Sequence, residues 1–270
     1  MIKLIATDLD GTLLDDEKRL PEGFGETIDR LREQGVRFAF ASGRSFISLK
    51  QQFAEYLDRL ICICDNGAYV WYDGRTAFTS CLEREQVLDM VRFCGELGLL
   101  ILLCGRNATY HNSFKAAHFD EISKYYTNQV RLDDLTAFDD EIYKIAVFDE
   151  KGIEEKTLPK LMSRYGRDFN VALSGKFWVD IMAKEASKGQ ALRKLQNRLG
   201  VSYEETMSFG DYLNDIDLLE NAYYSFAVEN SHPLVRKAAN FSTGSNNDGS
   251  VMKEVCELCF EKAAHPEARH

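Results

Sequence analysis

Short apolar segments alternate with amphipathic helical segments at both ends of this chain, and this alternation limits the possible folds more than any other feature. The first third holds three strand-like runs, "IKLIATDLD", "VRFAFASGR" and "LICICDNGA", separated by helical segments at 22–35 and 45–57. The same alternation returns after residue 186 with "TMSFGD" and "SFAVEN" between helical segments. Near-continuous apolar strands alternating with helices indicate a parallel sheet covered on both faces. We therefore expect an α/β fold with a doubly wound parallel-sheet core.

The segment between these two parts has a different pattern. A hairpin around Asp73-Gly74 leads to a helical segment at 83–98, then to "LLILLCG", "ATYHNS", a short helix near 118–126 and "IYKIAVF". A helical segment at 153–166 and the hairpin-like "FNVALSGKFWVDIM" follow. The sequence predicts a core formed by 1–82 and 187–270, interrupted by an α+β domain at 83–186.

Charge and cysteine content exclude several classes of protein. The net charge of −10 disfavours a nucleic acid or an anionic membrane as the main partner, because both need a basic face. The 7 cysteines are mostly in apolar stretches without zinc-ligand spacing, which favours reduced thiols. No leader-like segment or run of ~20 apolar residues is evident. We expect a cytoplasmic protein that is a monomer or a weak homo-oligomer.

The first strand-like run ends in two aspartates, in the pattern Asp8-Leu9-Asp10-Gly11-Thr12. An ordinary turn is one interpretation, because Asp and Gly are common turn residues. A calcium loop is disfavoured, because its sixth position should be Gly and its twelfth Glu, whereas Gly11 is fourth and Arg19 is twelfth. Two carboxylates this close can also flank one ligand, and we favour a chemical role for them.

Polar groups follow three other core strands as well. Ser42-Gly43-Arg44 precedes a helix, where a hydroxyl and free backbone N–H groups suit a phosphate, although Ser-Gly is also a common turn. Lys188 opens another helix, where a cation opposes the helix dipole. Such a lysine is usually solvated, and it indicates a functional role only where an anion lies nearby.

The run from Gly210 to Asp215 also begins at a strand end. Asp211, Asn214 and Asp215 can each cap a helix, but three such groups within five residues exceed what capping needs. Oxygen ligands of this kind suit a hard divalent cation such as Mg²⁺. Because open α/β sheets bind ligands beyond the carboxyl ends of their strands, all these clusters, together with Asp65-Asn66-Gly67, are expected to share one crevice.

In combination, these motifs resemble those of the haloacid dehalogenase-like phosphohydrolases, and the chain is similar to the Cof-type subfamily. In that subfamily a large α/β cap lies between the second and third motifs, where 83–186 stands here. The resemblance spans essentially the whole chain and includes "NNDGSV" at 246–251. Tyr212 stands where the family often has Gly, Ser42 where Thr is frequent, and Glu229 within "AVENSHP" departs from a Gly-Asn-Ala stretch.

The resemblance implies hydrolysis of small phosphomonoesters through an aspartyl-phosphate. Asp8 would be the nucleophile, and Asp10 would protonate the leaving group and then activate water. It also implies the other site residues: Mg²⁺ held by Asp8, the Asp10 backbone carbonyl and Asp211 with Asp215 nearby, and phosphoryl oxygens held by Ser42, Gly43, Arg44, Lys188 and Asn214.

Two alternatives stay open at this point. Relatives with this type of cap include sugar phosphomutases, which return the phosphoryl group to a sugar. A non-catalytic ligand-binding or regulatory protein could also keep the fold. The family acts on sugar phosphates and cofactor phosphates, and the cap is expected to select among them. The stretch 105–113 and the hairpin around Ser174-Gly175-Lys176 are candidates for those contacts, although solvated loops are the favoured interpretation of both.

Overall fold

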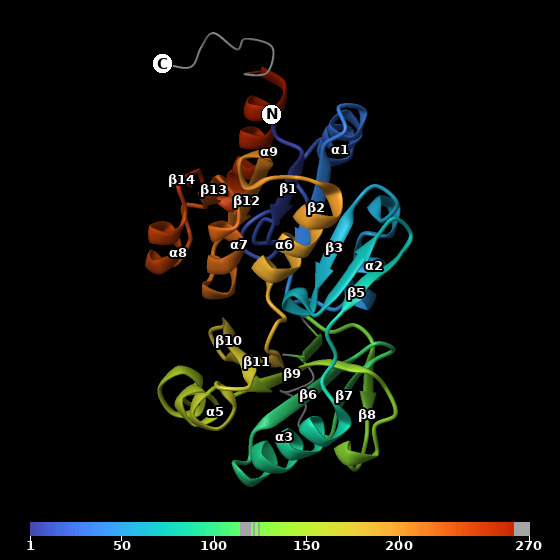
Figure 1. Ribbon diagram of the computed structural model, residues 1–270. Helices are drawn as coiled ribbons and strands as arrows, with labels where there is room; N and C mark the ends of the chain where they lie inside the picture. Colours follow the sequence, from blue (N-terminus) through green and yellow to red (C-terminus); the bar gives the residue numbers. More distant parts are fainter. Residues whose placement is uncertain (114–119, 121, 124, 262–270) are drawn as a thin grey trace.

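Two β-sheets organise the described part of the protein, an eight-stranded sheet in the upper half of Figure 1 and a six-stranded sheet in the lower half. The computed structural model describes residues 1–113, 120, 122, 123 and 125–261. The eight-stranded sheet contains β1 Leu4–Thr7, β2 Arg37–Ala41, β3 Ile61–Cys64, β4 Tyr69–Tyr72, β5 Arg75–Thr79, β12 Thr206–Gly210, β13 Tyr224–Ala227 and β14 Phe241–Ser242.

The strand order of this sheet is β14-β13-β12-β1-β2-β3-β4-β5. The six strands from β14 to β3 run parallel, and β4 and β5 form an antiparallel edge. The chain moves outward from β1 to β3 on one side and from β12 to β14 on the other. This is the predicted doubly wound α/β fold, and its strand order reverses between β1 and β12.

Helices cover both faces of the eight-stranded sheet. Their bounds are α1 Phe24–Glu33, α2 Phe46–Gln52, α6 Lys188–Leu199, α7 Ile216–Glu220, α8 Pro233–Ala238 and α9 Ser250–Cys256. Successive strand residues point to opposite faces. Ile5 therefore packs with Phe24 of α1 on one face, while Leu4 packs with Leu192 of α6 and Leu218 of α7 on the other.

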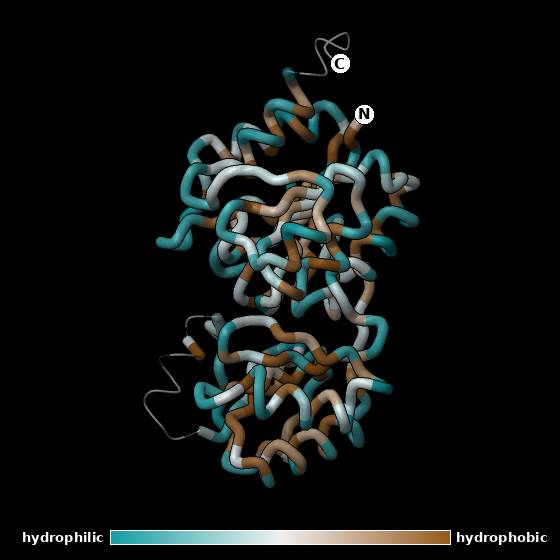
Figure 2. Tube along the Cα trace, turned by 90° about the vertical axis from the view of Figure 1, so that its left-hand side faces the viewer, coloured by the Kyte–Doolittle hydropathy of each residue, from teal (hydrophilic) through white to brown (hydrophobic). Residues whose placement is uncertain are grey.

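The six-stranded sheet has the order β10-β11-β9-β6-β7-β8, with only β7 and β8 parallel. Its strands are β6 Leu100–Gly105, β7 Thr109–His111, β8 Gln129–Arg131, β9 Ile142–Phe148, β10 Phe169–Gly175 and β11 Trp178–Ala183, and α3 Arg84–Glu96 and α5 Leu158–Tyr165 pack on it. Both helices lie on the side away from the eight-stranded sheet (Figure 1). Each lobe concentrates its apolar segments inside (Figure 2).

Several local predictions are confirmed and others are corrected. The hairpin turn at Asp73-Gly74 joins β4 to β5, and both residues have the positive φ that this tight turn requires, 56° and 72°. The helix expected at 153–166 begins as a π-helical turn, Ile153–Thr157, before α5. Strand β8 was missed, because only three mostly polar residues form it. Of the helix expected near 118–126, residues 118, 119, 121 and 124 lie outside the described residues, and the described residues 120, 122 and 123 are helical.

The predicted domain boundaries stay a proposal. All strands of the six-stranded sheet lie within 83–186, and all strands of the eight-stranded sheet lie outside it. We call 83–186 the cap and the remainder the core. Within the described part of the chain, no helix combines the length and the apolar character that crossing a membrane demands.

Candidate active site

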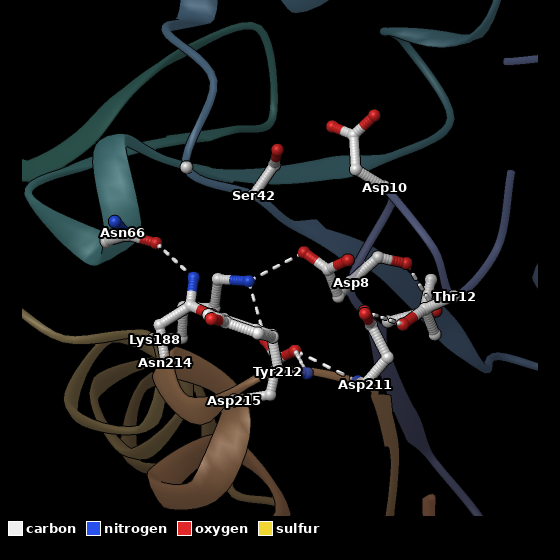
Figure 3. Close-up of polar contacts among 12 residues, drawn as sticks. Asp8, Asp10, Thr12, Ser42, Asn66, Lys188, Asp211, Tyr212, Asn214 and Asp215 are labelled. Carbon is white, nitrogen blue, oxygen red and sulfur yellow. Dashed lines mark hydrogen bonds and ion pairs between the residues drawn. The ribbon is translucent and has the colours of Figure 1, made fainter. Parts of the chain in front are cut away.

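The candidate site lies at the carboxyl edge of the core sheet, where the strand order reverses. Strands β1 and β12 are neighbours there, with Thr7 paired to Phe209. The chain beyond β1 carries Asp8 and Asp10, and the chain beyond β12 carries Asp211 and Asp215 (Figure 3). Ser42 follows β2, Asn66 follows β3, and Lys188 is the first residue of α6. Residues far apart in sequence therefore meet because parallel strands end at one edge.

A buried charge cluster forms the centre of this site. The Lys188 Nζ atom lies 2.6 Å from Asp8 Oδ1 and 2.6 Å from Asp215 Oδ1. The Lys188 side chain is 1% exposed, so the solvated alternative for this lysine is excluded. Burial works against its charged form, but Asp215 and Asp8 outweigh that effect and raise the pKa of Lys188. The positive charge of Lys188 therefore offsets negative charge on both Asp8 and Asp215.

The remaining carboxylate of the cluster belongs to Asp211. Its Oδ1 accepts a hydrogen bond of 2.7 Å from the Thr12 hydroxyl. Asp215 Oδ2 accepts from the backbone N–H groups of Asp211 and Tyr212, each at 3.1 Å, and thereby fixes this loop. Gly11 has a φ of 85°, and a Cβ there would approach the Asp211 carboxylate to 2.8 Å. Glycine is thus required where the two loops meet.

Three carboxylates in this cluster are suited to a divalent cation. Single oxygens of Asp8, Asp211 and Asp215 all lie within 4.8 Å of one another. Burial raises the pKa of Asp8 well above its usual range, and the charges of Asp215, Asp211 and Asp10 raise it further against the opposing effect of Lys188. Burial, followed by Asp215, raises the pKa of Asp211 to about 7. An all-oxygen set with this excess of negative charge fits Mg²⁺.

Asp10 occupies a different environment from Asp8. Strand β1 ends at Thr7, so the extended geometry that would align the two side chains does not persist, and the Asp10 carboxylate points away from Asp8 in Figure 3. Arg44 holds it with two hydrogen bonds, of 2.7 Å from Nε and 2.6 Å from Nη2, and Lys18 Nζ lies 2.8 Å away. Burial acts to raise the pKa of Asp10, but Arg44 and Lys18 together lower it.

The pKa values of the two aspartates are therefore separated, but in the sense opposite to the one that the resemblance implies. The implied roles would need Asp10 protonated and Asp8 ionised at the start. Two changes would reverse the order: a cation beside Asp8, which favours its ionised form, and exchange of the Arg44 contact of Asp10 for a leaving group.

The predicted phosphate-binding residues Ser42, Gly43, Arg44 and Asn214 line the same cavity as Asp8, and several of them make hydrogen bonds within the protein. Ser42 Oγ accepts a hydrogen bond of 3.1 Å from the backbone N–H of Arg44. The Arg44 guanidinium is engaged by Asp10 and Gln52. Its predicted role in phosphate binding accordingly stays a prediction. Asn214 Nδ2 donates to Asn66 Oδ1 at 3.0 Å (Figure 3).

A cavity of about 470 Å³ opens onto these groups between the core and the cap. The core side includes Asp8, Asp10, Ser42 and Asn214. The cap side adds the aromatic residues Tyr125, Tyr126, Phe177 and Trp178 and the hairpin residues Ser174, Gly175 and Lys176. The hairpin was a candidate for substrate contacts, with a solvated loop as the favoured interpretation, and it lines this cavity. The stretch 105–113 does not line it.

Sequence reasoning missed two charged residues of the cap that also line this cavity. Lys144 on β9 and Asp180 on β11 are 1% and 2% exposed, and their charged atoms lie 3.2 Å apart. Each stands alone among apolar residues, in "IYKIAVF" and "WVDIM". The available signal was a single charged residue within a strand whose other residues are apolar. Such a residue predicts a charged partner, since charges are almost never fully buried without one.

Comparisons with known proteins found relatives that match almost the whole chain. A sequence model for haloacid dehalogenase-like hydrolases matches residues 5–255. The 5-amino-6-(5-phospho-D-ribitylamino)uracil phosphatase YbjI of Escherichia coli (strain K12) is 29% identical over 97% of this chain and 98% of its own length.

Solved structures share the fold. SMU.1108c from Streptococcus mutans UA159 superimposes with a TM-score of 0.91 at 24% identity, covering 96% of this chain and 99% of its own. The sugar phosphatase BT4131, described as subclass IIB of the superfamily, has a TM-score of 0.79 at 21% identity, covering 95% and 99%.

Proposed function

The chain belongs to the haloacid dehalogenase-like hydrolases of the Cof type and is a phosphatase acting on small phosphate esters, and from this premise we propose a Mg²⁺-dependent mechanism through an aspartyl-phosphate. The observation that carries the proposal is the buried cluster of Asp8, Asp211 and Asp215 around Lys188, which opens into a substrate-sized cavity. A non-catalytic role is set aside, because the family model describes hydrolases and the curated relative is named a phosphatase.

Asp8 is the nucleophile in this proposal. One of its carboxylate oxygens attacks the phosphorus atom, and the bond from phosphorus to the leaving-group oxygen breaks. Its position supports this role, because the side chain lines the cavity directly and Lys188 fixes one of its oxygens at 2.6 Å. Water then attacks the phosphorus of the aspartyl-phosphate and releases inorganic phosphate.

Asp8, Asp211 and Asp215 would hold Mg²⁺, with the backbone carbonyl of Asp10 as a further ligand. The cation supplies charge neutralisation between the carboxylate nucleophile and the phosphate dianion, which otherwise repel each other. Lys188 contributes a fixed positive charge to the same task. A phosphoryl group arriving beside Asp8 would share this ammonium with Asp8 and Asp215, which explains a lysine at a helix N-terminus.

Asp10 is the proposed general acid and base. It protonates the departing oxygen and then takes a proton from the attacking water. In this role the Asp10 carboxyl group breaks its contacts with Arg44 and Lys18 and turns toward the leaving group. Arg44 and Lys18 then hold the Asp10 side chain only in its resting position. The hydroxyl of Ser42, the backbone of Gly43 and the amide of Asn214 are proposed to hold phosphoryl oxygens, with Arg44 at the edge of the same loop.

The substrate class we propose is a phosphomonoester of a sugar or of a cofactor that carries a ring. The cap presents four aromatic side chains to the cavity, and a ring of the substrate can stack on such a wall. The name of the Escherichia coli relative, whose substrate combines a uracil with a phosphorylated ribityl chain, supports the same class. Overlapping specificity among such esters is expected.

A panel of phosphomonoesters assayed with Mg²⁺ for release of inorganic phosphate tests this function. We expect turnover of ring-bearing esters, with sugar phosphates, pyridoxal phosphate and flavin mononucleotide as the first compounds. Transfer of the phosphoryl group to another position of a sugar, without release of phosphate, would identify the mutase alternative instead.

Removal of metal is expected to abolish activity. EDTA should stop phosphate release, and Mg²⁺ should restore it. Independently of turnover, Mg²⁺ at 100 times its Kd should raise the free energy of unfolding by about 2.7 kcal/mol, a shift of several degrees in Tm. Asp211→Asn keeps the acceptor for Thr12 but removes a charge, so it should lose most of that shift. Hydrolysis that persists in EDTA would contradict the metal site.

We also propose a cellular location and an assembly state for the protein. The seven cysteines are free, and Cys62, Cys64, Cys94, Cys104 and Cys259 are buried, which supports a reducing compartment such as the cytoplasm. We propose a monomer or a weak homo-oligomer, as expected from the sequence.

A further inference from the structure

Two cap side chains connect the cap to the loops of the candidate site. Lys144 and Asp180 lie on the face of the cap sheet that also carries Ala146 and Trp178, opposite to the face covered by α3 and α5. The Lys144 Nζ atom donates a hydrogen bond of 2.7 Å to the Gly43 carbonyl of the core. Asp180 Oδ2 accepts one of 2.6 Å from Asn66 Nδ2, also of the core.

Asn66 passes this contact on to the phosphate-binding groups. Its Oδ1 accepts from Asn214 Nδ2 at 3.0 Å, and its backbone N–H donates to the Ser42 carbonyl at 3.0 Å. A continuous series of hydrogen bonds therefore runs from Asp180 in the cap to Asn214, and a second contact runs from Lys144 to the loop of Ser42.

The turn that carries Asn66 depends on such contacts for its conformation. Asp65 and Asn66 have positive φ values of 47° and 51°, and Gly67 follows at 95°. Two successive non-glycine residues in the left-handed region persist only where surrounding structure holds them. Gly67 also packs on the Ser187 carbonyl, where an added Cβ would collide, so the same turn touches the start of α6 beside Lys188.

Fold stability alone does not explain a charge pair in this place. Replacing a buried ion pair by well-packed apolar residues is often neutral or stabilising, so burial of a lysine and an aspartate is weak evidence for a stabilising role. Unlike apolar residues, Lys144 and Asp180 form directional hydrogen bonds, and these bonds end on specific atoms of Gly43 and Asn66. Tyr126 covers the ammonium, its ring centroid 5.6 Å from Nζ.

We propose that Lys144 and Asp180 are positioning residues of the cap, which hold the Ser42-Gly43 loop and the Asn66–Asn214 pair in the arrangement that binds the phosphoryl group. The inference rests on the proposed function of this site and extends it to residues of the cap that need not touch the phosphoryl group. Because a misplacement of about 1 Å can cost about 100-fold in rate, loss of either residue is expected to lower turnover even of a small ester.

The test uses Lys144→Met and Asp180→Leu in the full chain with Mg²⁺, because leucine removes the acceptor for Asn66 as well as the charge. Three quantities are measured: kcat and KM for p-nitrophenyl phosphate, and the Kd of inorganic phosphate by calorimetry. We expect kcat to fall by about 10- to 100-fold and phosphate binding to weaken in both variants. Lys144→Arg should restore much of both, because a guanidinium can also donate to the Gly43 carbonyl and to Asp180.

Matched controls come from the cap itself. Lys184→Met removes an ammonium that donates at 2.9 Å to the Gly166 carbonyl within the cap, and Asp89→Asn breaks a 2.8 Å pair with Arg164 there. Both should leave kcat and phosphate affinity unchanged. If Lys144→Met fails to fold, the double variant Lys144→Met/Asp180→Leu removes both charges of the pair together, and it should show the same two losses.

Three results would distinguish a positioning role from a structural role, from direct substrate contact and from failure of the proposed function. A lower Tm with unchanged kcat and unchanged phosphate affinity would overturn the positioning role. A rise in KM confined to bulky esters, with normal phosphate binding, would make these residues substrate contacts and would also overturn it. A wild-type protein that binds phosphate but hydrolyses no ester would contradict the proposed function, while the phosphate affinities of the variants would still decide the positioning role.

Discussion

Replacing Asp8 with asparagine is expected to lower kcat by at least about 10⁴-fold, because an amide cannot serve as the phosphoryl acceptor. The change is nearly isosteric and leaves Lys188 paired with Asp215 at 2.6 Å. The fold should not suffer. Burial and three neighbouring carboxylates raise the pKa of Asp8 in the folded state, so above the unfolded pKa its ionised form opposes folding. Removing that charge should leave Tm equal or higher at pH 7.

Asp29→Asn is the matched control, because Asp29 pairs with Arg59 on the core surface, at 3.0 Å and away from the site. It should retain full activity. The measurements are phosphate release from the best ester of the panel and thermal unfolding followed by circular dichroism. Appreciable turnover by a well-folded Asp8→Asn protein would sink the assignment of the nucleophile.

Asp10→Asn is expected to slow hydrolysis by about 10²- to 10⁴-fold for alkyl phosphates, whose leaving groups need a proton. For p-nitrophenyl phosphate the loss should be much smaller in the first step, because p-nitrophenolate departs without protonation. Asparagine keeps an oxygen that can accept from Arg44, whereas alanine would leave this buried guanidinium with fewer partners. The effect of the charge is thereby separated from that of packing.

The measurement is kcat/KM over a series of esters whose leaving groups differ in pKa. This ratio reports the steps up to phosphorylation of Asp8, so it isolates the acid role of Asp10 from its later role as base. An equal loss of kcat/KM across the series would argue against the acid role. Arg44→Met, tested beside it, should weaken binding of inorganic phosphate only if the guanidinium also contacts the phosphoryl group.

Much of the candidate site could be predicted because each motif is local. Asp8 with Asp10, Ser42 with Gly43, and Asp211 with Asp215 stand directly after apolar strands, and the topology of parallel strands brings such residues to one edge. Lys188 was assigned only through the family resemblance, because a lysine at a helix N-terminus opposes the dipole and, taken alone, is usually solvated. The predicted fold follows from the same alternation of strands and helices.

What the sequence could not supply is which side chains contact each other. The separate partners of Asp8 and Asp10 depend on where β1 ends and on how Arg44 and Lys188 approach from other elements, so the order of the two pKa values emerged only from the structure. Nothing local in "IYKIAVF" indicates that Lys144 reaches a carbonyl 101 positions away.

The sequence by itself determined the doubly wound core and the insertion of the cap, and it supplied the candidate groups for phosphoryl transfer. Only the tertiary structure decided which charges are compensated, how the cap contacts the phosphate loops, and which side chains line the cavity. The physical reason is that strand and helix patterns are periodic and local. Electrostatic pairing and cavity shape instead depend on distances of a few ångströms between segments that the chain brings together only on folding.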